Sequence, residues 1–201
     1  MIGRCKVVAI EGSHGTGKTT LAHGVAATLS AKGYPVTMVG EVVRSSSWFQ
    51  EALLRGDGTL EVDGFIHLFA DQLRQEMEAT IQSAFAVLDR TVLSCLGYWN
   101  LRVRSPRRTG QIREALEQVA RLHAARYDVL VYSRDMYPLE DGQDVFRETD
   151  ETFRMRSDRA IRACISRIGL RPIDIPRGFG VGEKIEWVVG RLDGTGINGW
   201  E

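Results

Sequence analysis

Short apolar runs alternate along the chain with longer segments in which apolar residues recur every three or four positions. The short runs are rich in Val, Ile and Leu, which is typical of strands buried on both faces of a parallel sheet. The longer segments have the spacing of one apolar helix face. Strands are predicted at residues 5–10, 34–39, 84–88, 128–132 and 171–175. Helices are predicted at residues 18–32, 48–54, 65–85, 92–102, 111–126, 150–168 and 183–192.

This alternation of strands and helices favours a single α/β domain over residues 1–201. Strand-helix-strand units place helices on both faces of a mostly parallel sheet. A chain of 201 residues can bury one substantial core, and no repeat, low-complexity tract or linker divides it. We therefore expect a three-layer fold built on a five-stranded sheet.

A glycine-rich segment, GSHGTGKT at residues 12–19, joins the first predicted strand to the first predicted helix. It fits the pattern G-x-x-x-x-G-K-[ST], in which backbone N–H groups and the positive end of the helix face phosphate oxygens. Lys18 can reach the β- and γ-phosphates, and the Thr19 hydroxyl can bind Mg²⁺. The predicted cofactors are therefore ATP and Mg²⁺. The predicted nucleotide-binding residues are Gly12, Ser13, His14, Gly15, Thr16, Gly17, Lys18, Thr19 and Thr20, with the His14 side chain expected to face solvent.

A phosphate-binding loop does not define a reaction, because switch GTPases, motor-type ATPases and small-molecule kinases share it. The Asn-Lys-x-Asp motif with which GTPases read guanine is missing from the sequence. A motor-type ATPase needs a longer chain and usually an arginine from a neighbouring subunit. A compact P-loop kinase is the class that remains.

Four segments near the predicted strand ends resemble the motifs of a known family. They are EGSHGTGKTT at residues 11–20, EVVR at 41–44, DRTVLSCLGY at 89–98 and EDGQDVFRETDETF at 140–153. Together they resemble the thymidylate-kinase and deoxynucleoside-kinase group of P-loop kinases, and within it the ribosylnicotinamide-kinase-like compact ATPase/kinase family. EVVR departs from the Arg-Glu-Pro-Gly-type segment of thymidylate kinases and looks more like the Glu-x-x-Arg of nucleoside kinases. The resemblance implies ATP-dependent phosphoryl transfer to a nucleoside or nucleotide-like molecule, with a lid over about residues 137–159.

Three charged residues follow predicted strands, and ligands bind beyond the carboxyl ends of the strands in such sheets. Glu41 can accept a proton from an attacking hydroxyl or orient a sugar or base; the alternative is an exposed capping glutamate. Asp89 can hold the Mg²⁺ shell or act as the base, and Arg90 can fix the acceptor. The alternative is that Asp89 and Arg90 only cap the next helix. Glu41 as base favours an uncharged hydroxyl as acceptor, whereas a monophosphate acceptor needs no strong base.

Arg147 lies in an acidic segment where the resemblance to kinases places a lid. An arginine that arrives only on lid closure stabilises the transferring phosphoryl group and helps to exclude water. We therefore predict that Arg147 is catalytic. Arg154 and Arg159 lie on the following predicted helix, where they can instead pair with Asp150 and Asp158.

Aromatic and basic side chains near the strand ends are candidates for the acceptor pocket. Trp48 and Tyr98 can stack on a base, and residues 175–182 form the predicted wall on the base side of the nucleotide. The predicted acceptor-binding residues are Glu41, Arg44, Trp48, Arg90 and Tyr98. The predicted catalytic residues are Lys18, Glu41, Asp89 and Arg147, and the predicted metal ligands are Thr19 and Asp89.

The distribution of charge limits the possible partners. Basic and acidic residues both number 26, which excludes a protein that binds nucleic acid mainly through bulk electrostatics. Residues 101–126 nevertheless carry seven arginines against two glutamates. The stretch 102–108 can contact a phosphorylated acceptor, or a nucleic-acid strand if the acceptor is a modified base in DNA. The alternative is a solvated surface.

Cysteine content and hydropathy indicate where the protein works. Three widely spaced cysteines without a C-x-x-C pattern favour a reducing compartment over a disulfide framework or a zinc site. No apolar run approaches the ~20 residues that span a bilayer, and no signal-peptide pattern precedes the first strand. We therefore expect a cytoplasmic protein without membrane partners, and the sequence is compatible with a homodimer.

Two alternative functions fit the same residues. One is a kinase for a non-nucleoside metabolite, an antibiotic or a hydroxymethylated base in DNA. The other is a regulatory module in which bound ATP switches a partner interaction. Such a module needs neither an acceptor pocket nor a base, so replacing Glu41 and Asp89 should leave its function intact.

Overall fold

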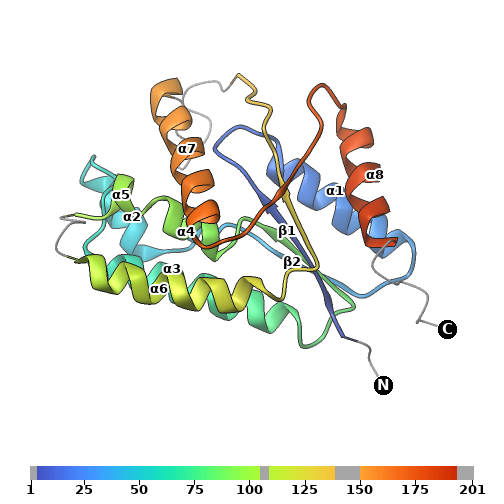
Figure 1. Cartoon of the computed structure of the whole chain (residues 1–201), viewed down its shortest axis with the longest axis horizontal. Helices are drawn as coiled ribbons and strands as arrows, with labels where there is room; N and C mark the ends of the chain where they lie inside the picture. The colour runs from blue at the N-terminus through green and yellow to red at the C-terminus, as the bar shows by residue number, and fades with distance from the viewer. Residues whose placement is uncertain (1–3, 105–108, 139–149, 194–201) are drawn as a thin grey trace.

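The computed structural model describes residues 4–104, 109–138 and 150–193, and its strands form one five-stranded sheet (Figure 1). The strands are β1 (Lys6–Glu11), β2 (Val36–Val39), β3 (Phe85–Asp89), β4 (Val129–Tyr132) and β5 (Ile173–Asp174). Their order is β2-β3-β1-β4-β5, and each strand is parallel to its neighbours. The predicted α/β fold class is therefore confirmed.

Helices cover both faces of this sheet (Figure 1). They are α1 (Lys18–Ala31), α2 (Ser47–Leu54), α3 (Val62–Ala79), α4 (Val92–Gly97), α5 (Trp99–Arg102), α6 (Gly110–Ala124), α7 (Glu151–Arg167) and α8 (Val181–Asp193), with a 3₁₀ turn η1 (Val42–Arg44). Helices α1 and α8 pack together on one face, and α3, α4, α6 and α7 lie on the other. Within the described ranges, no helix is both long and apolar enough to cross a membrane.

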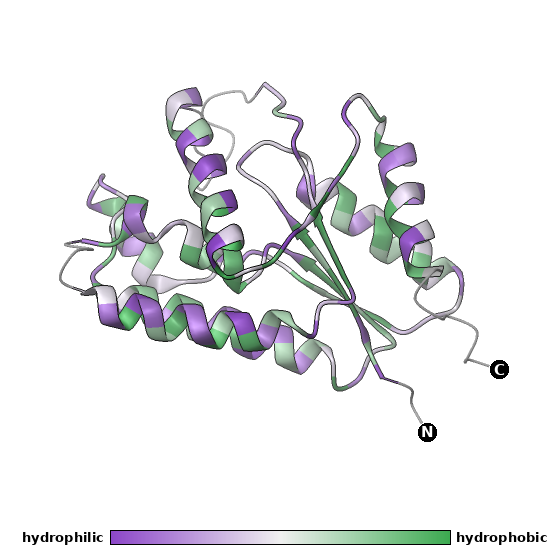
Figure 2. Cartoon of the chain, viewed as in Figure 1, coloured by the Kyte–Doolittle hydropathy of each residue, from purple (hydrophilic) through white to green (hydrophobic). Residues whose placement is uncertain are grey.

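The sheet supplies the centre of the core. Val8 and Ile10 of β1 pack into the cluster formed with α1 and α8, whereas Val7 and Ala9 face the opposite cluster with Ala79 of α3. Figure 2 accordingly shows hydrophobic strands between helices that carry both hydrophobic and hydrophilic residues. Since alternate residues of a strand point to opposite faces, burial on both sides explains why β1 reads as a continuous apolar run.

Two predicted helices differ from the structure by more than two residues at an end or by a break. The helix predicted at residues 65–85 is α3, which ends earlier because the Thr80 N–H and hydroxyl both donate to the Met77 carbonyl, at 3.1 and 2.7 Å. The Ala84 N–H then donates to the Pro35 carbonyl at 2.9 Å, which starts the next strand. The helix predicted at residues 92–102 is divided into α4 and α5 at Tyr98.

Helices α4 and α7 pack with almost no space between their backbones. A Cβ atom added to Gly97 of α4 would lie 2.7 Å from Cγ1 and 2.8 Å from Cα of Ile161 in α7. Because both atoms are buried and one belongs to the backbone, the helices would have to separate to admit a methyl group. Glycine at this position therefore sets the distance between the two helices.

Gly97→Ala is expected to lower the free energy of unfolding by about 1–3 kcal/mol, because the methyl group overpacks the α4–α7 contact. Gly190→Ala is the matched control, since Gly190 is an exposed residue within α8 and its added Cβ would meet nothing within 4 Å. The control should gain about 0.5–1 kcal/mol from the higher helix propensity of alanine. Urea unfolding measures both variants, and equal stability of the two would contradict the packing of α4 on α7.

Candidate functional site

Loops from four parallel strands meet at one edge of the sheet. Ile10 of β1 is level with Asp89 of β3, and Glu11 is level with Tyr132 of β4. The loops that follow these strands, together with the loop after β2, surround a groove of about 250 Å³. The groove is lined by residues 14–20, Glu41, Arg44, Arg90, Tyr137 and Pro138. The topology therefore brings most of the predicted site residues together at the edge where ligands bind in open α/β sheets.

The glycine-rich loop at residues 12–19 has a backbone that only glycine permits at two decisive positions. Gly12 has φ +146°, and a Cβ there would lie 2.6 Å from the Ser133 carbonyl oxygen. Gly17 has φ +78° and caps the N-terminus of α1. Because these glycines turn the chain into α1, the free N–H groups of the first helical turn face the groove. Such an arrangement binds anions.

Buried hydroxyl groups hold this loop in shape. Thr16 Oγ1 donates to the Ser13 carbonyl at 3.1 Å, and Ser133 Oγ donates to the Thr16 carbonyl at 2.7 Å. Ser13 Oγ donates to the Arg154 carbonyl of α7 at 2.8 Å. These hydrogen bonds attach the loop to α7 and to the residue that follows β4.

Lys18 is buried inside this loop, with 5% of its surface exposed. Its Nζ donates to the Ser13 carbonyl at 2.5 Å. Burial, and next the positive charge of Arg90, lower the pKa of Lys18 from 10.5 to about 7, although Asp89 and Glu41 act in the opposite direction. A desolvated ammonium group of this kind gains most from a ligand that brings negative charge.

Asp89 and Thr19 offer oxygen atoms on the same side of the groove. Thr19 Oγ1 donates to Asp89 Oδ2 at 2.6 Å, while Asp89 Oδ1 is buried without a hydrogen-bond partner. A hydroxyl and a carboxylate are the hard oxygen donors that Mg²⁺ prefers. Among the described residues, no cluster of three or more His, Cys, Asp and Glu could hold a metal ion. The pair therefore fits a Mg²⁺ ion whose remaining ligands come from phosphate and water.

Arg90 follows Asp89 in a left-handed conformation, with φ +76°. This backbone costs roughly 1–3 kcal/mol in a residue other than glycine. Its side chain is 7% exposed, and Nε lies 2.7 Å from Glu41 Oε1. Nη1 donates to the Gly12 carbonyl at 3.3 Å and to the Tyr98 hydroxyl at 3.4 Å. The strained turn thus directs one guanidinium group toward three separate loops.

A buried carboxylate stabilises the turn that contains Arg90. Glu11 is fully buried and accepts hydrogen bonds from the Thr91 N–H at 3.0 Å, the Thr91 hydroxyl at 2.6 Å and the Ser94 hydroxyl. Burial raises the pKa of Glu11, although the two hydroxyl donors lower it. The end of β1 is thereby joined to the start of α4.

A cavity of about 80 Å³ opens beside the groove, between η1, α3 and α4. Its polar lining comes from His14, Glu41, Gln72, Arg90, Ser94, Tyr98 and Arg102, and its apolar lining includes Val42, Val43, Phe49, Leu60, Phe65, Leu68 and Cys95. The groove and the cavity share His14, Glu41 and Arg90. A molecule in the cavity therefore lies next to an anion in the groove.

The structure places several predicted residues differently from the expectation. Trp48 is 41% exposed and packs against Gly64, and it does not line the cavity. Its neighbour Phe49 lines the cavity instead. His14 does not face solvent but is half-buried, with its ring edge-on to Tyr98 at 5.7 Å. Burial and the charge of Arg90 hold the pKa of His14 well below its usual value.

The arginines that the sequence analysis singled out lie in different places. Arg44 lines the groove and lies 3.5 Å from Glu41, and Arg102 lines the cavity. Arg104 is paired at the surface with Asp57, at 2.5 Å. Residues 105–108 of the basic stretch and Arg147 lie outside the described residues.

Arg154 contacts the glycine-rich loop, although the sequence favoured Arg147 over it as the catalytic arginine. The alternative was that Arg154 pairs with Asp150 or Asp158, but its Nε donates to the His14 carbonyl at 3.2 Å and its Nη2 to the Tyr137 carbonyl at 2.8 Å. Asp150 instead caps α7 by accepting from backbone N–H groups. Because 140 residues separate Arg154 from His14, no local pattern signals this contact.

A second, apolar groove of about 250 Å³ lies beside Gly17. Tyr137 and Val181 line it, and Val181 belongs to the predicted base-side wall at residues 175–182. Lys184 fixes Tyr137, because its Nζ donates to the Tyr137 hydroxyl at 2.8 Å and to Asp135 Oδ2 at 2.7 Å. An apolar surface next to an anion-binding loop can receive the flat ring of a ligand.

Comparison with known proteins agrees with this architecture. Residues 7–181 match the family model described as an AAA domain, and no curated protein sequence matches the chain. The fold is similar to the NadR protein in complex with NAD and AMP-PNP, with a TM-score of 0.67 at 20% identity, and to NadR in complex with NR, with a TM-score of 0.70 at 20% identity. These alignments cover 96% of this chain, which spans about half the length of NadR, 50% and 52% respectively.

Deoxyadenosine kinase from M. mycoides with the products dCMP and dCDP bound is also similar, with a TM-score of 0.65 at 15% identity. The alignment covers 94% of this chain and 99% of the kinase chain. At these identities the likeness establishes the fold. The three-layer P-loop architecture predicted from the sequence is confirmed.

Proposed function

The chain belongs to the AAA domain family, and on that premise we propose that it is a P-loop kinase that transfers the γ-phosphoryl group of ATP to a nucleoside-like small molecule. One observation carries this proposal: the cavity and the groove share His14, Glu41 and Arg90. An acceptor and a phosphate donor can therefore meet across these side chains. A module that only binds ATP needs no second cavity.

On the donor side, the glycine-rich loop binds the phosphates and Lys18 neutralises their charge. The N-terminus of α1 and the buried ammonium group act where the transferred phosphoryl group develops its charge. Because hydrogen bonds to β4 and α7 hold the loop in advance, little reorganisation accompanies the reaction.

Thr19 and Asp89 would hold the Mg²⁺ ion. The unpartnered Asp89 Oδ1 and the adjacent Thr19 hydroxyl provide the oxygen atoms. When bound, Mg²⁺ supplies charge neutralisation at the β- and γ-phosphates.

On the acceptor side, Glu41 is the group that orients the attacking hydroxyl and accepts its proton. Glu41 lines both the groove and the cavity, whereas Asp89 lines neither and is bonded to Thr19. We therefore assign the base to Glu41 and the metal shell to Asp89. Arg90 holds Glu41 Oε1 at 2.7 Å, which fixes the direction of the carboxylate.

The proteins of similar fold support a nucleoside-like acceptor. NadR holds AMP-PNP in one structure and NR in another, and the deoxyadenosine kinase holds dCMP and dCDP. A lid with a catalytic Arg147 remains part of the proposal. The contact of Arg154 with the glycine-rich loop supports it, because Arg154 lies within the predicted lid at about residues 137–159.

The test is ADP release with ATP and Mg²⁺ against nucleosides, nucleoside monophosphates, nicotinamide riboside and DNA that contains hydroxymethylated bases. We expect at least one free nucleoside or nucleotide to raise ADP release well above the rate without acceptor. ATP binding without any stimulation by an acceptor would favour the regulatory module and overturn the proposal. Stimulation by the modified DNA alone, weakening steeply with salt, would identify the DNA-base kinase instead.

ATP binding is expected to take up close to one proton at about pH 8.5, where free Lys18 is mostly neutral because its pKa is about 7. The phosphates raise this pKa, so the bound form holds the proton, and the affinity for ATP should fall as the pH rises above 7. Calorimetry in buffers of different ionisation enthalpy measures the uptake. A Lys18→Met variant is the control and should take up no proton through this position. Equal uptake by both proteins would show that another group titrates.

A further inference from the structure

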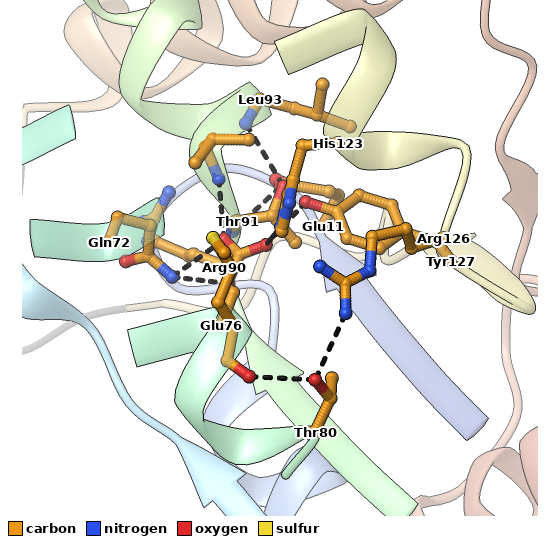
Figure 3. A network of polar contacts seen from close by, with 12 residues as sticks. Glu11, Gln72, Glu76, Thr80, Arg90, Thr91, Leu93, His123, Arg126 and Tyr127 are labelled. Atoms are coloured by element: carbon orange, nitrogen blue, oxygen red, sulfur yellow. Dashed lines mark hydrogen bonds and ion pairs between the residues drawn. The ribbon is translucent and has the colours of Figure 1, made fainter. Parts of the chain in front are cut away.

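The buried carboxylate of Glu76 has no part in the proposed reaction, yet it lies behind the acceptor cavity. Glu76 of α3 is 1% exposed. Its Oε1 accepts from Gln72 Nε2 at 3.0 Å and from the Val92 N–H at 2.9 Å. Its Oε2 accepts from His123 Nε2 at 2.9 Å and from the Tyr127 hydroxyl at 2.6 Å (Figure 3). Each oxygen thus receives two hydrogen bonds.

The hydrogen bonds of Glu76 determine how the Gln72 amide is oriented. Gln72 Nε2 faces Glu76 Oε1 and the Arg90 carbonyl oxygen, at 3.0 and 3.4 Å. Both atoms are acceptors, so the amide group that faces them must be the NH₂. The opposite orientation would bring the Gln72 oxygen against a buried carboxylate, which is repulsive in a low-dielectric site.

The Gln72 side chain therefore presents its carbonyl oxygen to the cavity. Gln72 is 1% exposed and lines the cavity. Among the described residues, no donor reaches its Oε1, and both amide hydrogens already have acceptors. An N–H group of a molecule in the cavity can therefore donate to this oxygen.

Glu76 also accepts hydrogen bonds from three groups other than Gln72. The Val92 N–H is a backbone donor at the start of α4, and the Tyr127 hydroxyl donates from the segment before β4. Burial and the neighbouring Glu76 carboxylate raise the pKa of Tyr127, so the hydroxyl keeps its proton. Donors from α4, α6 and the α6–β4 connection therefore hold the carboxylate toward Gln72.

We propose that Glu76 is a positioning residue that sets acceptor specificity: it locks the Gln72 amide so that Oε1 accepts a hydrogen bond from an N–H group of the bound ring. This inference rests on the proposed function. The preferred acceptors are nucleosides whose ring carries an amino or amide N–H donor. A bound ring without such a donor would cover Gln72 Oε1 and leave it without a hydrogen bond.

The experiment measures kcat/KM for ADP release with pairs of acceptors that differ at this donor. The pairs are adenosine and purine riboside, cytidine and 2-pyrimidinone riboside, and nicotinamide riboside and nicotinic acid riboside. The wild-type protein is expected to prefer the donor-bearing member of the pair it accepts by about 10- to 100-fold. The preference should lie mainly in the KM of the acceptor and leave the KM of ATP unchanged.

Variants of Glu76 and Gln72 test whether Glu76 orients the Gln72 amide or only stabilises the fold. Glu76→Ala frees the Gln72 amide to turn, so the preference should fall about tenfold or more. Glu76→Gln should retain the preference, because the fixed Val92 N–H keeps the new carbonyl oxygen on the Gln72 side. A merely structural role would lower activity toward both members of a pair alike. Gln72→Met removes the acceptor oxygen but leaves Glu76 its hydrogen bonds from the Val92 N–H, His123 and Tyr127. It should also abolish the preference, which keeps the proposal testable if Glu76→Ala does not fold.

Three outcomes would overturn this inference. The first is a wild-type protein that uses both members of each pair equally. The second is a folded Glu76→Ala variant that keeps the full preference, and the third is a Gln72→Met variant that keeps it. In each case ADP release continues, so the proposed kinase function stands. No ADP release with any acceptor overturns the proposed function itself, and the inference with it.

Discussion

Lys18→Ala is expected to lower kcat for acceptor-dependent ADP release by about 10²- to 10³-fold, because it removes the positive charge that faces the transferring phosphoryl group. The side chain is buried, and within the described ranges its Nζ donates to the Ser13 carbonyl alone. Its loss should leave the fold intact, since a desolvated ammonium group contributes little to stability without a negative partner. Steady-state kinetics and far-UV circular dichroism measure the two effects.

Lys32→Ala is the matched control for this variant. Lys32 caps the other end of the same helix, where it is exposed, and its replacement should leave kcat unchanged. Phosphoryl transfer at the wild-type rate by Lys18→Ala would contradict the proposed mechanism. A lost fold in Lys18→Ala would show instead that the lysine is structural.

Asp89→Asn is expected to lower kcat by about 10- to 100-fold and to raise the Mg²⁺ concentration needed for half-maximal activity, because it removes a charge from the metal shell. The substitution keeps the size of the side chain, and its carbonyl oxygen can still accept from the Thr19 hydroxyl, which lies at 2.6 Å in the wild type. The large effect should therefore come from the lost charge rather than from lost packing. Titration of activity with Mg²⁺ separates metal affinity from the maximal rate.

Asp174→Asn provides the control at the end of another strand. Asp174 of β5 pairs with Arg134 and Arg162 at 3.0 and 3.1 Å. These surface pairs are worth about 0–1 kcal/mol, so the substitution should change neither kcat nor the Mg²⁺ requirement. If Asp89→Asn behaves like Asp174→Asn, then Asp89 has no role in the metal shell.

Local sequence patterns were sufficient for the sheet and for the glycine-rich loop. The apolar run at the start of the chain predicts a strand buried on both faces, and β1 has this burial. The spacing of Gly12, Gly17 and Lys18 predicts a turn into a helix, and α1 begins at Lys18. These features follow from residues close together in the chain, so their physical cause is visible in the sequence.

The sequence did not show which face of α2 points toward the cavity. Trp48 and Phe49 are adjacent in α2, and only one of two neighbours on a helix can face the core. The N-cap at Ser46, whose hydroxyl accepts from the Phe49 N–H at 3.3 Å, sets this phase and turns Phe49 inward. Trp48 was predicted because it lies near a strand end, whereas the N-cap places Phe49 at the cavity.

The sequence by itself determined the fold class, the anion-binding loop and the placement of Glu41 and Asp89 at strand ends, because strand burial and loop spacing are local properties. Only the tertiary structure decided which side chains share a space. Arg154 reaches a loop 140 residues away, and Glu76 collects donors 16, 47 and 51 residues distant. Hydrogen bonds of this kind form only after the sheet has brought α3, α4, α6 and α7 together, so no local pattern encodes them.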